Sequence, residues 1–461
     1  MTASASQSAR PLRWYRRGAG PWGALVLAAV VLAGCGGGDE PDVEIRGLPE
    51  PISGDRVPVL TSDQKLEVDE AAANERVFLP RPYRNLHWPQ PGAVPTHAIY
   101  HLALPPSLEL AWRADIGTGD TFDARLVGEP VVQGGRVFTI DTRAKVTAFD
   151  TADGDVLWER TIERKGEPNR LGFGGGVAYA DGRIYAATGH GILAAINADT
   201  GRVDWQFDAG VPMRGGPTVD RDRVVTVTHD NQIFALDADT GEVLWEQLGL
   251  AEPAGVIGAS SPVITPDTAI VALSSGELNA YRVENGVVIW QDVLSRTRRL
   301  TPLATLNDID GHPVVDRGRV FAISHSGRMV SIDLRSGERI WEKNLGGVST
   351  PWVAGDNIFV VTTDNEVVGM TRSGGRVRWV TELQRFEDQE DREGILRWTG
   401  PVLAGDRLVV VSSHGYALTL SPYTGEVLSA RELPAGSTVA PVVADRTLYI
   451  LTSEGDLLAF R

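Results

Sequence analysis

The sequence predicts an all-β protein, an eight-bladed β-propeller whose ring is closed by an N-terminal strand that completes the last blade. Two observations support this prediction. A motif seen at Ala235–Trp245, A-x-D-x-x-T-G-x-x-x-W, recurs about every 40–50 residues, and a period of this length indicates a repeat architecture. Each repeat also contains four short apolar runs separated by turn residues, which is the pattern of one propeller blade. Six further copies follow the motif: Ala148–Trp158, Ala195–Trp205, Ala280–Trp290, Ser331–Trp341, Gly369–Trp379 and Thr419–Ser429.

The motif itself predicts a β-hairpin with a tryptophan on its second strand. Asp237, Thr240 and Gly241 suit a tight turn, because Asp and Thr side chains bond nearby amides and Gly accepts a positive φ. Six of the seven copies carry a tryptophan at the same place, so we expect these side chains to pack as plates between neighbouring blades. Together with one earlier residue, the docking tryptophans are Trp112, Trp158, Trp205, Trp245, Trp290, Trp341 and Trp379.

The two ends of the repeat region predict how the ring closes. Residues 108–112 alternate in polarity and end in Trp112, like the outgoing strand of each copy, but nothing before them supplies the rest of a blade. Residues 441–460 supply three strands and lack the fourth. We therefore expect the two fragments to share one sheet. Counting outgoing strands then gives eight blades over residues 108–461, and closure removes exposed sheet edges.

Residues 1–34 have the pattern of an export signal. Several arginines precede an apolar run, Ala24–Ala33, that is too short to span a bilayer. The run leads into Leu32–Cys35, and Leu-Ala-Gly-Cys resembles the bacterial lipobox, whose cysteine becomes the lipidated first residue of the mature chain. Cys35 is the only cysteine, so the chain can form no intrachain disulfide. An ordinary secretory signal with an incidental cysteine is the alternative interpretation.

Two segments separate this signal from the propeller. Residues 35–75 are Gly-rich and then acidic and Pro-containing, which predicts a flexible, lipidated tether. Residues 76–107 contain enough aromatic side chains to pack, so we expect an N-terminal extension that lies across the propeller. Its histidines could suggest a metal site, but packing or capping residues in an irregular segment are the favoured interpretation. These histidines are His87, His97 and His101.

The sequence offers no pattern for catalysis, a cofactor or a metal. It contains no G-x-S-x-G, H-E-x-x-H or EF-hand pattern. A formal net charge of −16 argues against nucleic acid and anionic lipid as partners. Four histidines recur at the second hairpin turn of their blades, but equivalent positions on different blades are spread around the ring and are not expected to converge on one ion. They are His190, His229, His325 and His414.

Long joins on a rigid propeller are where function is expected. The join over 291–312 holds a basic cluster followed by two acidic residues, Asp308 and Asp310. Neighbouring clusters of opposite charge favour a protein-binding face, and a solvated loop is the equal alternative. The basic residues are Arg296, Arg298 and Arg299. The other long joins span 161–176, 246–260 and the heavily charged 381–397.

The repeat resembles that of the eight-bladed pyrroloquinoline-quinone (PQQ) dehydrogenases over residues 108–461. In that family the tryptophans dock neighbouring blades. Those enzymes are larger and usually carry a vicinal disulfide beside the quinone, which a chain with one cysteine cannot form. No calcium-ligand set or catalytic Asp can be assigned here. A PQQ-dependent oxidoreductase is therefore an alternative function, as is a generic propeller module that binds another protein.

A closer resemblance is to the BamB family, the propeller lipoproteins of the outer-membrane β-barrel assembly (BAM) machinery. It rests on the lipobox, a single propeller of about 350 residues, and the run from Leu306 to Gly337, which includes an L-x-D-x-D loop. The resemblance implies a non-catalytic scaffold without a cofactor. It also implies a lipid anchor at Cys35, on the periplasmic face of the outer membrane of a Gram-negative bacterium, and Gly36 after the cysteine favours that membrane.

The same resemblance implies partners and contact residues. The expected partners are the periplasmic POTRA domains of BamA and unfolded outer-membrane β-barrel proteins, whose insertion the complex assists. The implied acidic contacts are Asp308 and Asp310, whereas the arginines of the same join are candidate contacts from the charge pattern alone. Leu248 and Leu250 are expected contacts from the preceding join, although that join lacks the arginine of the family pattern.

Overall fold

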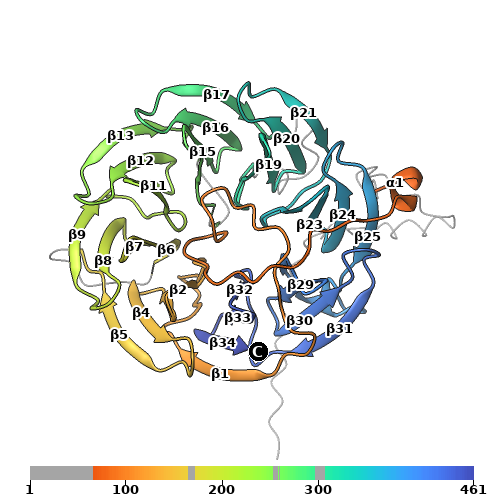
Figure 1. Ribbon diagram of the computed structural model, residues 1–461, viewed down its shortest axis with the longest axis horizontal. Helices are drawn as coiled ribbons and strands as arrows, with labels where there is room; N and C mark the ends of the chain where they lie inside the picture. Colours follow the sequence, from red (N-terminus) through yellow and green to blue (C-terminus); the bar gives the residue numbers. More distant parts are fainter. Residues whose placement is uncertain (1–65, 165–171, 253–257, 259, 296–306) are drawn as a thin grey trace, which may run out of the picture. The chain divides into compact units, whose positions relative to one another are not determined.

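The computed structural model describes residues 66–164, 172–252, 258, 260–295 and 307–461. These residues form eight four-stranded antiparallel sheets that follow one another around a ring, as Figure 1 shows. The prediction of an eight-bladed propeller is therefore confirmed. Blade 1 consists of β2 (Val131–Gln133), β3 (Arg136–Ile140), β4 (Lys145–Asp150) and β5 (Val156–Thr161), and blade 2 consists of β6 (Gly175–Ala180), β7 (Arg183–Thr188), β8 (Ile192–Asn197) and β9 (Val203–Asp208). Blade 3 consists of β10 (Thr218–Asp220), β11 (Arg223–Val227), β12 (Gln232–Asp237) and β13 (Val243–Leu248), and blade 4 consists of β14 (Val263–Ile264), β15 (Thr268–Ala272), β16 (Glu277–Arg282) and β17 (Val288–Val293).

The last blade joins the two ends of the propeller. Its sheet has the order β1-β34-β33-β32, and Trp112 of β1 lies opposite Ala459, in the register that pairs Ala235 with Trp245 in blade 3. The N-terminal strand thus completes the last blade, as predicted. Blade 5 consists of β18 (Val314–Asp316), β19 (Arg319–Ser324), β20 (Arg328–Asp333) and β21 (Arg339–Lys343), and blade 6 consists of β22 (Trp352–Ala354), β23 (Asn357–Val361), β24 (Glu366–Thr371) and β25 (Val377–Glu382). Blade 7 consists of β28 (Trp398–Ala404), β29 (Arg407–Ser412), β30 (Tyr416–Leu420) and β31 (Val427–Glu432), and blade 8 consists of β32 (Val442–Ala444), β33 (Thr447–Leu451), β34 (Asp456–Phe460) and β1 (Leu110–Asp115).

Tryptophan plates connect successive blades. The indole Nε1 of Trp205 donates to the Ala238 carbonyl, in the turn of the next blade, at 3.1 Å. The ring lies against Gly241, where φ is +75° and an added Cβ would come 2.6 Å from Trp205 Cδ2. Seven junctions share this geometry, with N···O distances of 2.8–3.3 Å. The pairs are Trp112–Gly154, Trp158–Gly201, Trp205–Gly241, Trp245–Gly286, Trp290–Gly337, Trp341–Gly375 and Trp379–Gly425.

The end of the predicted tether, 35–75, differs from the expectation of a flexible segment. Residues 66–75 pack on blade 6, where the short helix α1 (Glu70–Asn74) begins after Asp69. The Asp69 amide donates to the Val377 carbonyl of β25, and Glu75 forms an ion pair with Arg376 at 2.7 Å. Charge pairing with an outer strand therefore fixes ten residues that sequence composition assigns to the tether. Residues 1–65 lie outside the described part of the chain.

The charged join 381–397 contains a hairpin of its own, although the sequence suggested only a loop. Its strands are β26 (Phe386–Asp388) and β27 (Glu393–Ile395). The carboxylate of Asp388 accepts hydrogen bonds from the Glu390 and Asp391 amides at 2.9 and 3.0 Å, which stabilises the turn.

In the parts of the chain that the structure covers, no helix is both long enough and apolar enough to cross a membrane.

The N-terminal extension forms an inner strap, residues 83–104, that meets the first strand of every blade. Figure 1 shows it circling the centre of the ring. In blade 1, Trp88 and Val132 exchange backbone hydrogen bonds of 2.7 and 2.8 Å, and in blade 7 the Leu102 amide donates to the Leu403 carbonyl at 3.1 Å. One segment therefore contacts all eight blades. The remaining contacts are Asn85 with β32, Pro89 with β6, Gln90 with β10, Pro95 with β14, Thr96 with β18 and Tyr100 with β22.

We expect Gly241→Ala to lower the free energy of unfolding by about 2–4 kcal/mol, because the new Cβ meets Trp205 and the backbone keeps a left-handed φ. Gly182→Ala is the matched control. Gly182 has φ +81° but no atom within 4 Å of an added Cβ, so this change should cost only about 1 kcal/mol. Urea unfolding of both variants measures the difference, and equal losses would contradict the steric role of the indole.

The strap also predicts that the free energy of unfolding depends on pH. His97 is buried next to His312, and the centroids of the two rings are 4.9 Å apart. Its Nδ1 donates to the Pro313 carbonyl at 2.8 Å, and burial lowers the pKa of His97 from 6.5 to about 3. As pH falls, the unfolded chain takes up this proton first. Stability is therefore lost from about pH 6.5 down to about pH 3, at about 1.4 kcal/mol per pH unit.

His97→Asn removes this titration, and asparagine tolerates the left-handed φ of +57° at this position. Urea unfolding between pH 7 and pH 4 should show a shallower loss of stability in the variant than in the unmodified chain. The same slope in both proteins would show that the imidazole is not held neutral in the folded state.

Candidate functional site

Two large apolar side chains predicted to bind a partner are exposed beside blade 4. Leu248 ends β13, and Leu250 lies in the join that follows. Their side chains are 72% and 64% exposed. Leucine is usually a buried residue, and neighbouring exposed apolar side chains are typical of protein-binding surfaces.

Polar side chains hold the backbone beneath these leucines. The Leu250 amide donates to Glu277 Oε2 at 2.7 Å, and Asn231 Nδ2 donates to the Leu250 carbonyl at 2.7 Å. Asn231 is buried, and its Oδ1 accepts from the Ser274 amide and hydroxyl at 3.2 and 3.0 Å. The segment is thus ordered before any partner arrives, which reduces the entropy lost on binding.

Asp308 and Asp310 lie in the interior, where they surround the guanidinium of Arg214. Arg214 Nη2 donates to Asp308 Oδ1 at 3.0 Å, to the Ile309 carbonyl at 3.1 Å and to Asp310 Oδ1 at 3.2 Å. None of the three charged side chains is more than 5% exposed. The sequence led us to expect these carboxylates on the surface, facing a partner. They instead neutralise a buried cation from the join before blade 3 and fix the loop that carries them.

This buried cluster contains two carboxylates and one guanidinium. Burial raises the pKa of Asp310, and the charge and hydrogen bond of Arg214 offset that effect only in part. Burial also lowers the pKa of His229, and the nearby charge of Arg214 acts in the same direction. Both shifts favour the neutral forms of these side chains and so reduce the charge that the interior must hold.

One turn of blade 4, between β15 and β16, contacts both parts of the site. Leu273 packs so closely against Gly249 that an added Cβ would come 2.2 Å from Leu273 Cδ1. On the other side, the Leu273 carbonyl accepts a hydrogen bond from the Ile309 amide at 3.4 Å. The exposed leucines and the acidic loop therefore form one continuous feature. We call Leu248–Leu250 together with Asn307–Asp310 the blade 4 rim.

Several residues of the rim could not be anticipated from the repeat. Arg214, Asn231 and Glu277 each support the rim from a turn or a short join. One feature of the sequence could have singled out Arg214. It is the one charged residue in the Gly- and Pro-rich join 210–217. Four predicted residues, by contrast, lie outside the described part of the chain: the lipidation residue Cys35 and the basic residues Arg296, Arg298 and Arg299.

The histidines of the extension make separate contacts. His87 is exposed, and His97 bonds to blade 5 as described above. His101 bonds through Nδ1 to the Pro80 carbonyl at 2.8 Å and accepts from the Asp406 amide at 3.0 Å. Across the described ranges, no group of three His, Cys, Asp or Glu side chains is placed to hold a metal ion. The four repeat histidines lie in turns of blades 2, 3, 5 and 7: His190, His229, His325 and His414.

Comparisons with known proteins match more than half of the chain. The family model described as outer membrane protein assembly factor BamB matches residues 105–168 and 143–381. The outer membrane protein assembly factor BamB of Escherichia coli (strain K12) is 30% identical over 355 residues, which are 75% of this chain and 86% of that relative. The family-model match includes blades 1 to 5, blade 6 up to residue 381, and the joins between them.

Solved structures support the fold. BamB from Moraxella catarrhalis has a TM-score of 0.63 at 20% sequence identity and covers 77% of this chain and 98% of its own. A quinohemoprotein alcohol dehydrogenase from Comamonas testosteroni has a TM-score of 0.62 at 14% identity and covers 82% of this chain and 81% of its own. At these identities the two structures are evidence for the propeller alone.

The sequence matches decide the family. The matched residues include the run Leu306–Gly337, on which the resemblance to BamB partly rests. The relative from E. coli is aligned along most of its own length. The chain belongs to the family of the outer membrane protein assembly factor BamB.

Proposed function

We propose that this chain is a non-catalytic scaffold in outer-membrane protein assembly and that its blade 4 rim binds the periplasmic POTRA domains of BamA. A lipid on Cys35 anchors it to the periplasmic face of the outer membrane. There it helps unfolded β-barrel proteins to reach the membrane. The observation that carries the proposal is the pair of exposed leucines, Leu248 and Leu250, on a backbone that polar contacts hold fixed.

The two parts of the rim have different roles in this proposal. The leucines are the apolar anchors, since burying one leucine side chain against a partner contributes about 1.5–3 kcal/mol. Asp308 and Asp310 are positioning residues, because their carboxylates face Arg214 in the interior. They fix the end of the join that carries the arginines predicted to bind a partner. Those arginines are Arg296, Arg298 and Arg299.

The first test replaces both leucines. Leu248→Glu with Leu250→Glu should reduce co-purification of BamA by ~10-fold or more, because the carboxylates prevent apolar contact. The unfolding temperature should change little, since both side chains are exposed. The matched control is Leu157→Glu with Leu244→Glu, which changes two exposed leucines on outer strands. Equal BamA recovery in the two double variants would exclude the rim as the binding site.

The second test separates positioning from direct contact. Asp308→Asn should lower the free energy of unfolding by ~3 kcal/mol, because it removes a charged partner of the buried Arg214. Asp310→Asn should cost less, since burial already raises the pKa of Asp310 and favours its neutral form. Thermal unfolding and BamA co-purification are measured together. If Asp308→Asn abolishes BamA binding without any loss of stability, the carboxylate contacts BamA directly and the positioning role is wrong.

A further inference from the structure

The junction between blades 7 and 8 lacks the tryptophan that connects the other blades. Ser429 of β31 stands at the tryptophan position, because it pairs with Thr419 as Trp158 pairs with Ala148 in blade 1. The whole of β31 is exposed, whereas Trp245, Trp290 and other docking tryptophans are buried in the outer strands of their blades. This junction is therefore open where the others are filled.

A second aromatic side chain is missing at the same place. In blade 1, Phe138 pairs with Ala148 and lies 6.0 Å from the ring of Trp158. Four other blades contain an equivalent pair, with ring centroids 5.9–6.1 Å apart. In blade 7, Val409 takes the place of this aromatic residue opposite Thr419. Two rings are therefore replaced by a valine and a serine.

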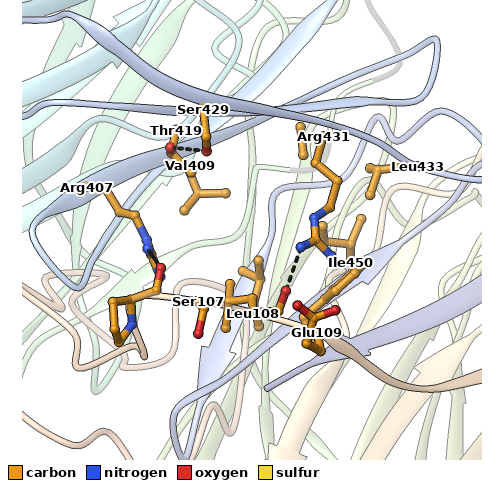
Figure 2. A pocket seen from close by; sticks show the side chains of 14 residues that line it. Ser107, Leu108, Glu109, Arg407, Val409, Thr419, Ser429, Arg431, Leu433 and Ile450 are labelled. Atoms are coloured by element: carbon orange, nitrogen blue, oxygen red, sulfur yellow. Dashed lines mark hydrogen bonds between the residues drawn. The ribbon is translucent and has the colours of Figure 1, made fainter.

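A cavity of about 190 Å³ occupies this position. Figure 2 shows Ser429 and Thr419 at one end, Val409 below them, and the segment Ser107–Glu109 along the opposite side. The apolar part of the wall comes from both blades and includes Leu433, Leu448, Ile450 and Phe460. An apolar cavity of roughly 150 Å³ in another protein holds benzene, so this volume suffices for an aromatic ring.

The two hydroxyls and the two guanidinium groups that line the cavity each have at least one hydrogen-bond partner. The hydroxyls of Thr419 and Ser429 are 2.7 Å apart and bond to each other. Arg431 donates to the Leu108 carbonyl at 2.6 Å, and Arg407 donates to the Pro106 carbonyl at 2.5 Å, as Figure 2 shows in part. An apolar ring can therefore enter without breaking these hydrogen bonds. The two arginines hold the segment 105–108 in place as one wall.

We propose that this cavity, the aromatic pocket, binds an aromatic side chain from an extended segment of an unfolded polypeptide. The occupant is indicated by the repeat itself, since an indole fills the equivalent position at seven junctions. A polypeptide fits because β31 is the edge strand of its sheet in the described chain, with backbone groups available for a further strand. A residue on an added strand opposite Ser429 would have its Cβ about 5 Å away, close enough for its ring to reach the pocket.

The choice of an unfolded polypeptide rests on the proposed function, but the pocket does not involve the blade 4 rim. The two proposals therefore fail in different assays. Loss of BamA co-purification in the rim variants tests the rim alone. A variant that fills the pocket should leave BamA co-purification unchanged.

The test uses the purified full chain and two dye-labelled peptides of alternating Thr and Ser, one with a central Trp and the other with Ala. Fluorescence anisotropy should show that the Trp peptide binds ~10-fold or more tightly than the Ala peptide. Ser429→Trp restores the side chain of the other junctions, so it should abolish this preference and raise the unfolding temperature. Ala430→Trp, on the opposite face of β31, is the matched control and should keep the preference.

Two results would overturn the proposal. One is an unmodified chain that binds both peptides equally, which would leave the cavity a simple packing defect. The other is a preference for the Trp peptide that persists in Ser429→Trp, which would place the binding site elsewhere. If Ser429→Trp does not fold, Val409→Phe fills the pocket from the other side, and the same loss of preference is required of it.

Discussion

The contact between a tryptophan and a glycine of the next blade is the interaction on which this propeller depends. Each blade is a separate four-stranded sheet, and among the described residues no sheet extends from one blade into the next. The indole supplies both apolar contact and one hydrogen bond to the neighbouring turn, as Trp205 does with Ala238. Only glycine leaves room for the ring, and only glycine adopts the required φ without strain. The motif therefore encodes an interface rather than a cofactor site.

The inner strap adds a constraint of a different kind. The tryptophan contacts act between neighbours, whereas residues 83–104 connect all eight blades through one segment near the ring's centre. At seven of the eight junctions, separation of two neighbouring blades would break strap contacts as well as a tryptophan plate. The strap also buries His97, whose lowered pKa makes its contribution to stability depend on pH. The strap and the strand that closes the ring, β1, thus both come from the residues that precede blade 1 in the sequence.

The fold was predictable because its information is local and repeated. Seven copies of one motif and the strand that ends in Trp112 define the turns, the plates and the number of blades without knowledge of any distant contact. The site was less predictable. Asp308 was predicted as a partner contact, but its burial depends on Arg214, which is 94 positions away in the join before blade 3. The packing of residues 66–75 on β25 was missed for the same reason. The charged partner of Glu75 is Arg376, which lies some 300 positions later in the sequence. Composition cannot reveal such pairs.

Function in a repeat protein is expected where a copy departs from the pattern, since the common residues serve the common fold. The blade 4 rim is one departure, because Leu248 at the end of β13 and Leu250 in the join that follows are both exposed. The junction of blades 7 and 8 is another, and it coincides with the ends of the propeller. There the turn that would receive a tryptophan is replaced by the segment leading into β1. A plate at Ser429 would have no glycine turn to meet, so this junction alone could lose its tryptophan without losing an established contact.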